Sequence, residues 1–157
     1  MRKGFLFFVL AVLGFSSVAA AQSSGGHDVS VSVPNILRLK IDDSTPQDQA
    51  NVDIDIRVSN GALEIAPAGS SVQVMANSAW QLSASYVPAS EADAAAQLMW
   101  RAEADESGWE RFTSYPQIIE SGENTLGWKS FDLRYGLQSL PADGHYQGTV
   151  TYTVTRP

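Results

Sequence analysis

The residue types that usually do chemistry are sparse in this chain. There are two histidines, His27 and His145, and no cysteine. A zinc site needs several converging nitrogen or sulfur ligands, and neither histidine has a neighbour at ligand spacing. The serines never lie in the Gly-x-Ser-x-Gly pattern of a nucleophile elbow, and no glycine-rich loop would cradle a phosphate. We therefore predict a protein that is not an enzyme and that needs no cofactor.

Carboxylates are the remaining reactive groups. Five of them gather in one stretch of the sequence, at Asp42, Asp43, Asp48, Asp53 and Asp55. Calcium prefers such oxygen ligands, although the spacing does not follow the EF-hand loop. Asp53 and Asp55 also fall on one face of a predicted strand, where water alone would satisfy them. Whether the stretch from Asp42 to Asp55 binds calcium stays open, and we interpret the carboxylates of residues 103–110 as a charged turn.

Large aromatic side chains could instead form a surface that binds sugar rings. The candidates are Trp80, Trp100, Trp109, Tyr115 and Trp128. In a chain without disulfides such residues also fill the core. Trp80 shares its alternating face with Leu82 and Tyr86, which predicts a core position. Core filling is the stronger interpretation of the set. Trp100 and Trp109 flank a predicted hairpin, and they are the better candidates for exposed aromatics that contact a ligand.

The chain opens with the pattern of a secretory signal peptide. Arg2 and Lys3 form a basic head, residues 5–15 are almost entirely apolar, and Ala19–Ala21 supply the small residues that signal peptidase reads. We expect residues 1–21 to be removed by cleavage before Gln22. The predicted location is therefore outside the cytoplasm, in the periplasm, on the cell surface or in the medium.

The rest of the chain has the length of one domain. We expect a flexible lead-in over residues 22–27 and a single domain over residues 28–157. The formal net charge of the whole chain is −7, and removal of the basic Arg2 and Lys3 would lower it to −9. Such a charge makes nucleic acid an unfavourable partner. No second apolar run follows, so we expect no membrane insertion after cleavage, and the sequence leaves the oligomeric state undetermined.

Alternation of apolar and polar residues predicts strands along most of this domain. It is clearest over residues 52–58, 72–76, 80–86, 131–135 and 146–154. Turn signals such as Asn60-Gly61 separate the alternating runs. About nine short strands at this spacing predict an all-β fold, an antiparallel immunoglobulin-like β-sandwich. Only residues 89–97 could form a helical turn, and a loop is an equal alternative there.

Two segments, Asn77–Ser85 and Pro141–Val154, together resemble bacterial secreted immunoglobulin-like sandwiches. Similar sequences occur in WxL-type cell-surface domains and in the closing strands of fimbrial and spore-coat-like subunits. Trp80-Gln81-Leu82 matches the first WxL motif, whereas Tyr152-Thr153-Val154 stands where the second motif would have Trp-x-Leu. In the WxL family, peptidoglycan binding is associated with the paired motifs, of which this chain has the first.

The residues that carry this resemblance also have a simple structural interpretation. We expect core positions for Trp80, Leu82, Tyr146, Gly148, Tyr152 and Val154. Among them, Gly148 would allow a bulge or the close approach of a large neighbour.

Three functions follow as hypotheses. The leading one is an exported, non-enzymatic structural or adhesive domain of the bacterial envelope. The first alternative is a module that binds cell-wall polysaccharide or another glycan through Trp100, Trp109 or nearby loops. The second is a fimbrial-type subunit that assembles by strand donation, for which Asp28–Val33 has the right alternation, although this segment is better interpreted as the domain's own first strand. The expected partners are thus cell-wall polysaccharide or another envelope protein.

Overall fold

The computed structural model describes residues 32–42, 44–104, 108–125 and 127–157. The predicted signal peptide, the lead-in and most of the expected strand Asp28–Val33 lie outside these residues. Within them, no helix is long and apolar enough to cross a bilayer.

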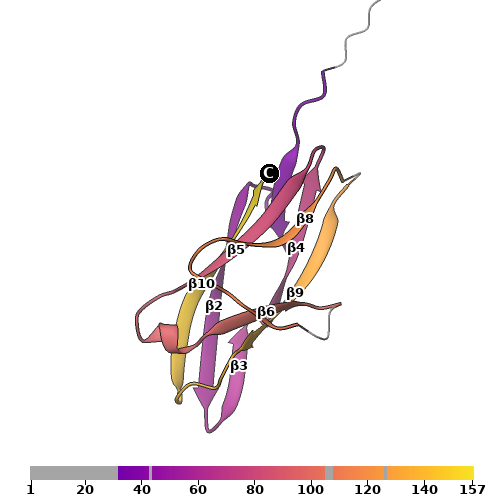
Figure 1. Cartoon of the computed structure of the whole chain (residues 1–157). Coiled ribbons are helices and arrows are strands. Elements are labelled where there is room, and N and C mark those ends of the chain that lie inside the picture. The colour runs from indigo at the N-terminus through magenta and orange to yellow at the C-terminus, as the bar shows by residue number, and fades with distance from the viewer. Residues whose placement is uncertain (1–31, 43, 105–107, 126) are drawn as a thin grey trace, which may run out of the picture. The chain divides into compact units, whose positions relative to one another are not determined.

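The described residues form two five-stranded sheets in which all neighbouring strands are antiparallel (Figure 1). Sheet A has the order β1 (Leu37–Ile41), β4 (Gly69–Ala76), β9 (Lys129–Leu137), β6 (Leu98–Ala102) and β7 (Glu110–Arg111). Sheet B has the order β3 (Ala62–Ala66), β2 (Gln49–Ser59), β10 (Gly144–Thr155), β5 (Trp80–Pro88) and β8 (Gln117–Gly122).

The predicted all-β sandwich is therefore confirmed, with ten strands in the described residues instead of about nine. The stretch left open as helical turn or loop contains a single 3-10 turn, η1 (Asp93–Ala95).

Strict alternation along the central strands explains the core. In β10 the side chains of Val150, Tyr152 and Val154 point inward and are buried, while the threonines between them face outward. Strand β5 buries Trp80 and Leu82 in the same way. Each strand thus contributes one apolar face, and the two faces pack together between the sheets. The core positions expected for these four motif residues (Trp80, Leu82, Tyr152 and Val154) are confirmed.

The other two motif positions have a more particular role. Gly148 is buried, and a Cβ atom there would lie 2.4 Å from the ring of Tyr86. The glycine therefore gives room to a large neighbour, as expected. Tyr146 is only half-buried, because it lies near the start of β10, and its hydroxyl donates a hydrogen bond of 2.8 Å to the carbonyl oxygen of Ala142. This bond resembles the tyrosine corner that fixes the turn before a sandwich strand.

A chain of three buried hydroxyl groups joins the two sheets. The hydroxyl of Tyr135 on β9 lies 2.6 Å from Oγ of Ser70 on β4 and 2.7 Å from the hydroxyl of Tyr152 on β10. Burial raises the pKa of both tyrosines above the ordinary value. Since each hydroxyl has a partner, these polar atoms are accommodated inside an otherwise apolar core.

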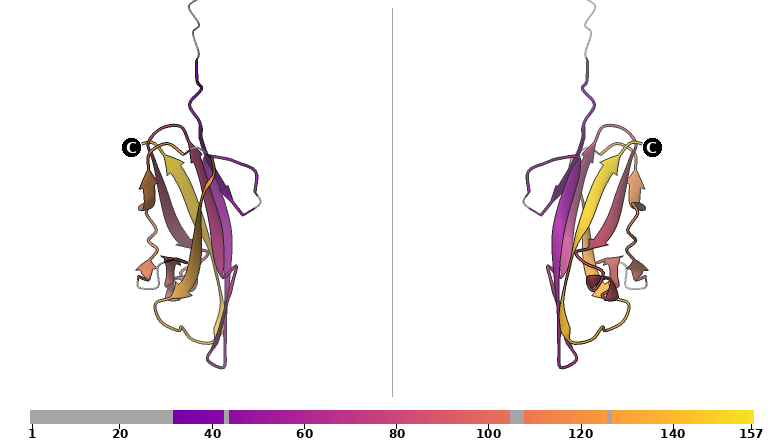
Figure 2. Two further views of the ribbon diagram at one scale, coloured as in Figure 1. Left: turned by 90° about the vertical axis from the view of Figure 1, so that its right-hand side faces the viewer. Right: turned by 90° about the vertical axis from the view of Figure 1, so that its left-hand side faces the viewer.

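The hairpin between β2 and β3 forms at the predicted Asn60-Gly61 turn. Both residues have positive φ, at 52° and 76°, as the tightest hairpin turns require. The backbone N–H of Asn60 donates to Oδ2 of Asp143 in the loop before β10. Figures 1 and 2 show this hairpin at the end of the sandwich opposite the C-terminus.

Candidate functional site

The two tryptophans that flank the β6–β7 hairpin lie in opposite environments. Leu98–Ala102 pairs with Glu110–Arg111 as the sequence predicts, with Trp100 opposite Glu110. Trp100 is only 7% exposed, and its ring packs against that of Phe112. The expectation that Trp100 is exposed and contacts a ligand is therefore wrong, because its position in the alternation of β6 turns it into the core. Trp109, in contrast, is 43% exposed.

The ring of Trp109 lies across the outer face of sheet A. Trp109 directly precedes β7 at the edge of the sheet, yet its six-membered ring reaches Gly136 on β9, beyond β6. A Cβ atom on Gly136 would lie 2.8 Å from two of the ring carbons, so only glycine admits the indole here. Met99 and Arg101 are the residues of β6 that face outward beside it. The sheet backbone therefore supports the ring from one side, and the ring remains substantially accessible to solvent.

Arg101 fixes the electrostatic environment of this ring. Its guanidinium carbon lies 4.9 Å from the centre of the Trp109 ring, within the range of a cation–π interaction. A hollow of about 410 Å³ adjoins the ring and is lined by Met99, Trp109, Gly136, Leu137 and Gln138. We call this group, with Arg101, the Trp109 platform. It combines a flat apolar ring, the guanidinium of Arg101 in contact with that ring, and the carboxamide of Gln138 at the hollow.

A second hollow lies on the same outer face of sheet A. It has a volume of about 300 Å³ and is lined by Ala68, Gly69, Ser70, Ser71, Glu103, Asp132, Leu133 and Arg134. Nε of Arg134 donates to Oε1 of Glu103 at 3.1 Å, and a second guanidinium nitrogen contacts the same oxygen. This ion pair raises the pKa of Arg134. We call this second group the Arg134 hollow, and it is polar where the Trp109 platform is aromatic.

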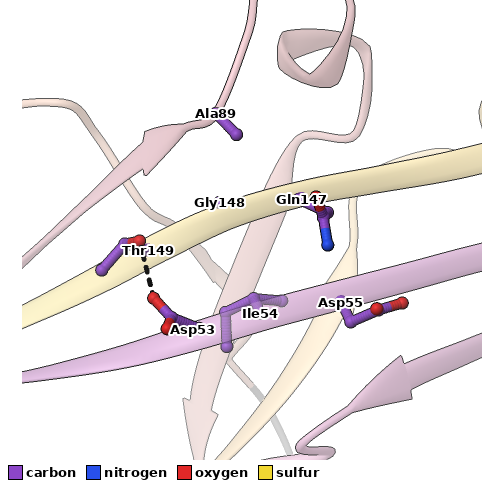
Figure 3. A pocket seen from close by; sticks show the side chains of 7 residues that line it. All are labelled: Asp53, Ile54, Asp55, Ala89, Gln147, Gly148 and Thr149. Atoms are coloured by element: carbon purple, nitrogen blue, oxygen red, sulfur yellow. Dashed lines mark hydrogen bonds between the residues drawn. The ribbon is translucent and has the colours of Figure 1, made fainter.

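Sheet B has a polar hollow of about 370 Å³ on its outer face, which Figure 3 shows from close by. Oγ1 of Thr149 on β10 donates to Oδ1 of Asp53 on β2 at 3.0 Å. Further along β2, Oδ1 of Asp55 lies 2.8 Å from Nε2 of His145 and 3.3 Å from Nε of Arg57. The hydrogen bond from His145 is the main cause that lowers the pKa of Asp55. Both carboxylates therefore already have protein partners.

The structure bears on the calcium hypothesis for the Asp42–Asp55 stretch. Asp48 forms an ion pair with Arg38 at 3.0 Å, while Asp53 and Asp55 contact β10 side chains. In the part of the chain that the structure describes, no three His, Asp or Glu side chains converge as metal ligands. Asp43 lies outside the described residues.

An apolar hollow of about 460 Å³ lies where the chain crosses from sheet A to sheet B. Between β7 and β8, the carbonyl of Thr113 accepts a hydrogen bond from the N–H of Tyr86. The hollow is lined mainly by Tyr86, Pro88, Ala96, Leu98, Phe112 and Tyr115. The buried hydroxyl of Tyr86 has no hydrogen-bond partner within the described part of the chain. Burial, with a smaller effect of Asp93, raises the pKa of Tyr86 to about 12. This hydroxyl is covered by protein atoms rather than open to a ligand.

Sequence reasoning found Trp109 but missed the residues around it. Gly136 and Arg134 lie 27 and 25 positions further along the chain, and only the register of β6 with β9 brings them beside Trp109 and Arg101. The alternation in β6 could have placed Arg101 outward. No local pattern distinguishes Gly136 from a glycine in a turn.

Comparison with known proteins gives no relative. No model of a protein family matches the chain, and neither a curated protein nor a solved structure does. The function must therefore be argued from the geometry of these sites.

Proposed function

We propose that this protein is an exported, non-catalytic adhesive domain of the bacterial envelope and that it binds a glycan through the Trp109 platform. The observation that carries the proposal is the position of the Trp109 ring. It is supported by Gly136, held beside Arg101, and 43% exposed.

A flat indole in this setting suits the apolar C–H face of a sugar ring. Aromatic side chains offer large rigid surfaces that lose little conformational entropy on binding. Gly136 and Arg101 already restrict the motion of Trp109 in the free protein, so little further ordering is required when a sugar stacks on it. The carboxamide of Gln138, which lines the same hollow, supplies a donor and an acceptor for sugar hydroxyl groups.

The non-catalytic part of the proposal is supported by carboxylates that are paired with other side chains of the protein. Asp53 and Asp55 are engaged with Thr149 and His145, and Glu103 is engaged with Arg134. Export rests on the leader-like pattern of residues 1–21 alone.

Strand donation is the less favoured alternative. Strand β10 already lies between β2 and β5, and β9 lies between β4 and β6. The central position of each sheet in the described residues is thus occupied by the chain itself.

Binding to isolated cell-wall sacculi tests the proposal. We expect the purified protein to co-sediment with sacculi in a saturable manner, and we expect Trp109→Ala to weaken this binding at least tenfold, since a well-packed aromatic anchor contributes about 2 kcal/mol or more. Gly136→Ala should weaken binding too, because the added methyl group displaces the ring.

The matched control is Trp128→Ala, which removes another partly exposed tryptophan that also lies near a cation, Lys40. It should leave binding unchanged. Absence of binding by folded wild-type protein, or an equal loss in Trp128→Ala, would overturn the proposal.

A further inference from the structure

The Trp109 platform and the Arg134 hollow lie on one continuous strip of sheet A. On β9 the outward-facing residues are Asp132, Arg134 and Gly136, while the residues between them face the core. Arg134 pairs with Arg101 and Gly136 pairs with Met99 on the neighbouring β6. The two hollows therefore adjoin along the same strand, with Arg101 and Arg134 between them.

We propose that this strip is a single extended site that binds a linear polysaccharide along its length, with Trp109 stacking one sugar and the Arg134 hollow holding a neighbouring sugar. The inference rests on the proposed glycan-binding function and names the class of glycan. From Gly136 to Asp132 the strand rises by about 13 Å, which is more than one pyranose ring needs.

The Arg134 hollow has the chemistry of a sugar subsite. Guanidinium and carboxylate groups supply several donors and acceptors close together, which suits the paired hydroxyl groups of a pyranose. The ion pair with Glu103 holds the Arg134 side chain in place, and the hydroxyl of Ser71 lies at the same hollow. The hollow is lined by two carboxylates, Glu103 and Asp132, and one guanidinium, Arg134. It therefore has no excess of positive charge to select an anionic sugar, and it fits a sugar recognised through its hydroxyl groups.

Strand β9 is an extended segment of nine residues, which favours an extended ligand. A polysaccharide whose rings are linked through equatorial bonds is extended and flat, and it presents its C–H faces to a platform and its hydroxyl groups sideways. Chitin fragments have this geometry, and N-acetylglucosamine is also a unit of bacterial cell walls, so these fragments are the appropriate probe.

The test is a fluorescence titration of the purified protein with N-acetylglucosamine and chitin oligosaccharides of two to six units. We expect affinity to rise with length by about tenfold or more and then to level off, because a second subsite adds its own contacts. Arg134→Ala should reduce the affinity for the tetramer to nearly that for the single sugar, and Trp109→Ala should abolish the fluorescence response.

The matched control is Arg57→Ala. Arg57 is an exposed arginine on sheet B, away from the proposed site, and it also pairs with a carboxylate, that of Asp55. It should retain the full dependence on length, and Glu103→Gln provides a milder disturbance of the Arg134 hollow if Arg134→Ala folds poorly. Equal affinity for one and six units overturns the extended site but leaves the proposed function standing. Failure of every oligosaccharide to bind, while sacculi still bind through Trp109, also overturns the extended site alone. Failure with both sacculi and oligosaccharides overturns both proposals.

Discussion

At the scale of single residues, Tyr152 shows how one hydroxyl group determines the chemistry of a core position. Its hydroxyl bonds to that of Tyr135, which in turn bonds to Ser70. A tryptophan at this point could not reproduce that bond with the same geometry. Tyrosine at this position is therefore explained by the bond between the two sheets.

Removal of that hydroxyl should weaken the domain modestly. Tyr152→Phe keeps the ring and leaves Tyr135 with only Ser70 as a partner, so we expect the free energy of unfolding to fall by about 1 kcal/mol. Urea unfolding measures the change. Tyr115→Phe is the control, because Tyr115 is exposed at the surface, and it should have no effect. A Tyr152→Phe protein as stable as the wild type would show that the inter-sheet bond contributes nothing.

The tryptophans show what sequence can and cannot predict about single side chains. Trp80 lies in a long alternating run, which fixed its inward orientation correctly. Trp100 lies in a strand of only five residues, where the run is too short to identify the buried face. The exposure of Trp109 was expected, but its support by Gly136 depends on strand pairing that no local pattern encodes.

At the scale of elements, the β2–β3 hairpin is the best example of a local signal that determines structure. Asn60-Gly61 adopts the positive φ values that its sequence predicts, and the turn sets the register of Ile56 with Ile65 and of Val58 with Leu63. The contact of Asn60 with Asp143 then ties the hairpin to the loop before β10.

Gly61→Ala should destabilise this element through its backbone. Alanine at a φ of 76° is strained, and we expect a loss of about 1 kcal/mol in the free energy of unfolding. Gly127→Ala is the matched control, because a Cβ atom there meets nothing within 4 Å and the backbone needs no positive φ. Thermal unfolding of both variants measures the difference. An equal change in the two proteins would mean that the turn conformation is not the cause.

The positions of most strands in the sequence could be predicted, but which strands pair with one another could not. The alternating runs located β2, β4, β5, β9 and β10, because each has one wet face. The pairing of β10 with β2 joins residues 86 to 104 positions apart. Such long-range order follows from how the faces of the sheets pack and not from any local sequence. The proposed site combines residues of β6, of β9 and of the segment that precedes β7. The sequence therefore could not predict which residues surround Trp109.

At the scale of the whole molecule, the outer faces of the two sheets differ. Sheet B presents rows of polar and charged side chains paired with one another, with Thr149 bonded to Asp53, Thr151 bonded to Asn51 and His145 paired with Asp55. Sheet A presents Trp109, Arg101 and Arg134. Among the described residues, the face of sheet A combines an aromatic platform with charged groups, which is why the proposals concern that face.

Buried tyrosines should make the whole domain sensitive to alkali. The folded state raises the pKa of Tyr86 to about 12 and raises those of Tyr135 and Tyr152. Unfolded tyrosine loses its proton near pH 10, so above that pH the unfolded state holds fewer protons and becomes favoured. The stability contributed by these groups is fully present below about pH 10 and is lost as pH rises toward the folded-state pKa values.

Urea unfolding at a series of pH values measures this effect. We expect the folding equilibrium constant to fall by up to about tenfold per pH unit for each buried tyrosine, and Tyr86→Phe should make the fall less steep. Stability that stays constant well above pH 10 would contradict the burial of these hydroxyl groups.

The order of strands in sheet A also has a mechanical consequence. Strand β4 lies between β1, through which the preceding chain enters the sandwich, and β9, along which the proposed glycan would lie. If the domain is an adhesin tethered through the segment before β1, tension passes from β1 through β4 to β9. The hydrogen bonds between antiparallel strands lie across the strands, so a pull along the strand axes shears many of them together instead of opening them one at a time. Under such a load, the lifetime of the attachment is limited by the rate at which sheet A yields as well as by the rate at which the sugar dissociates.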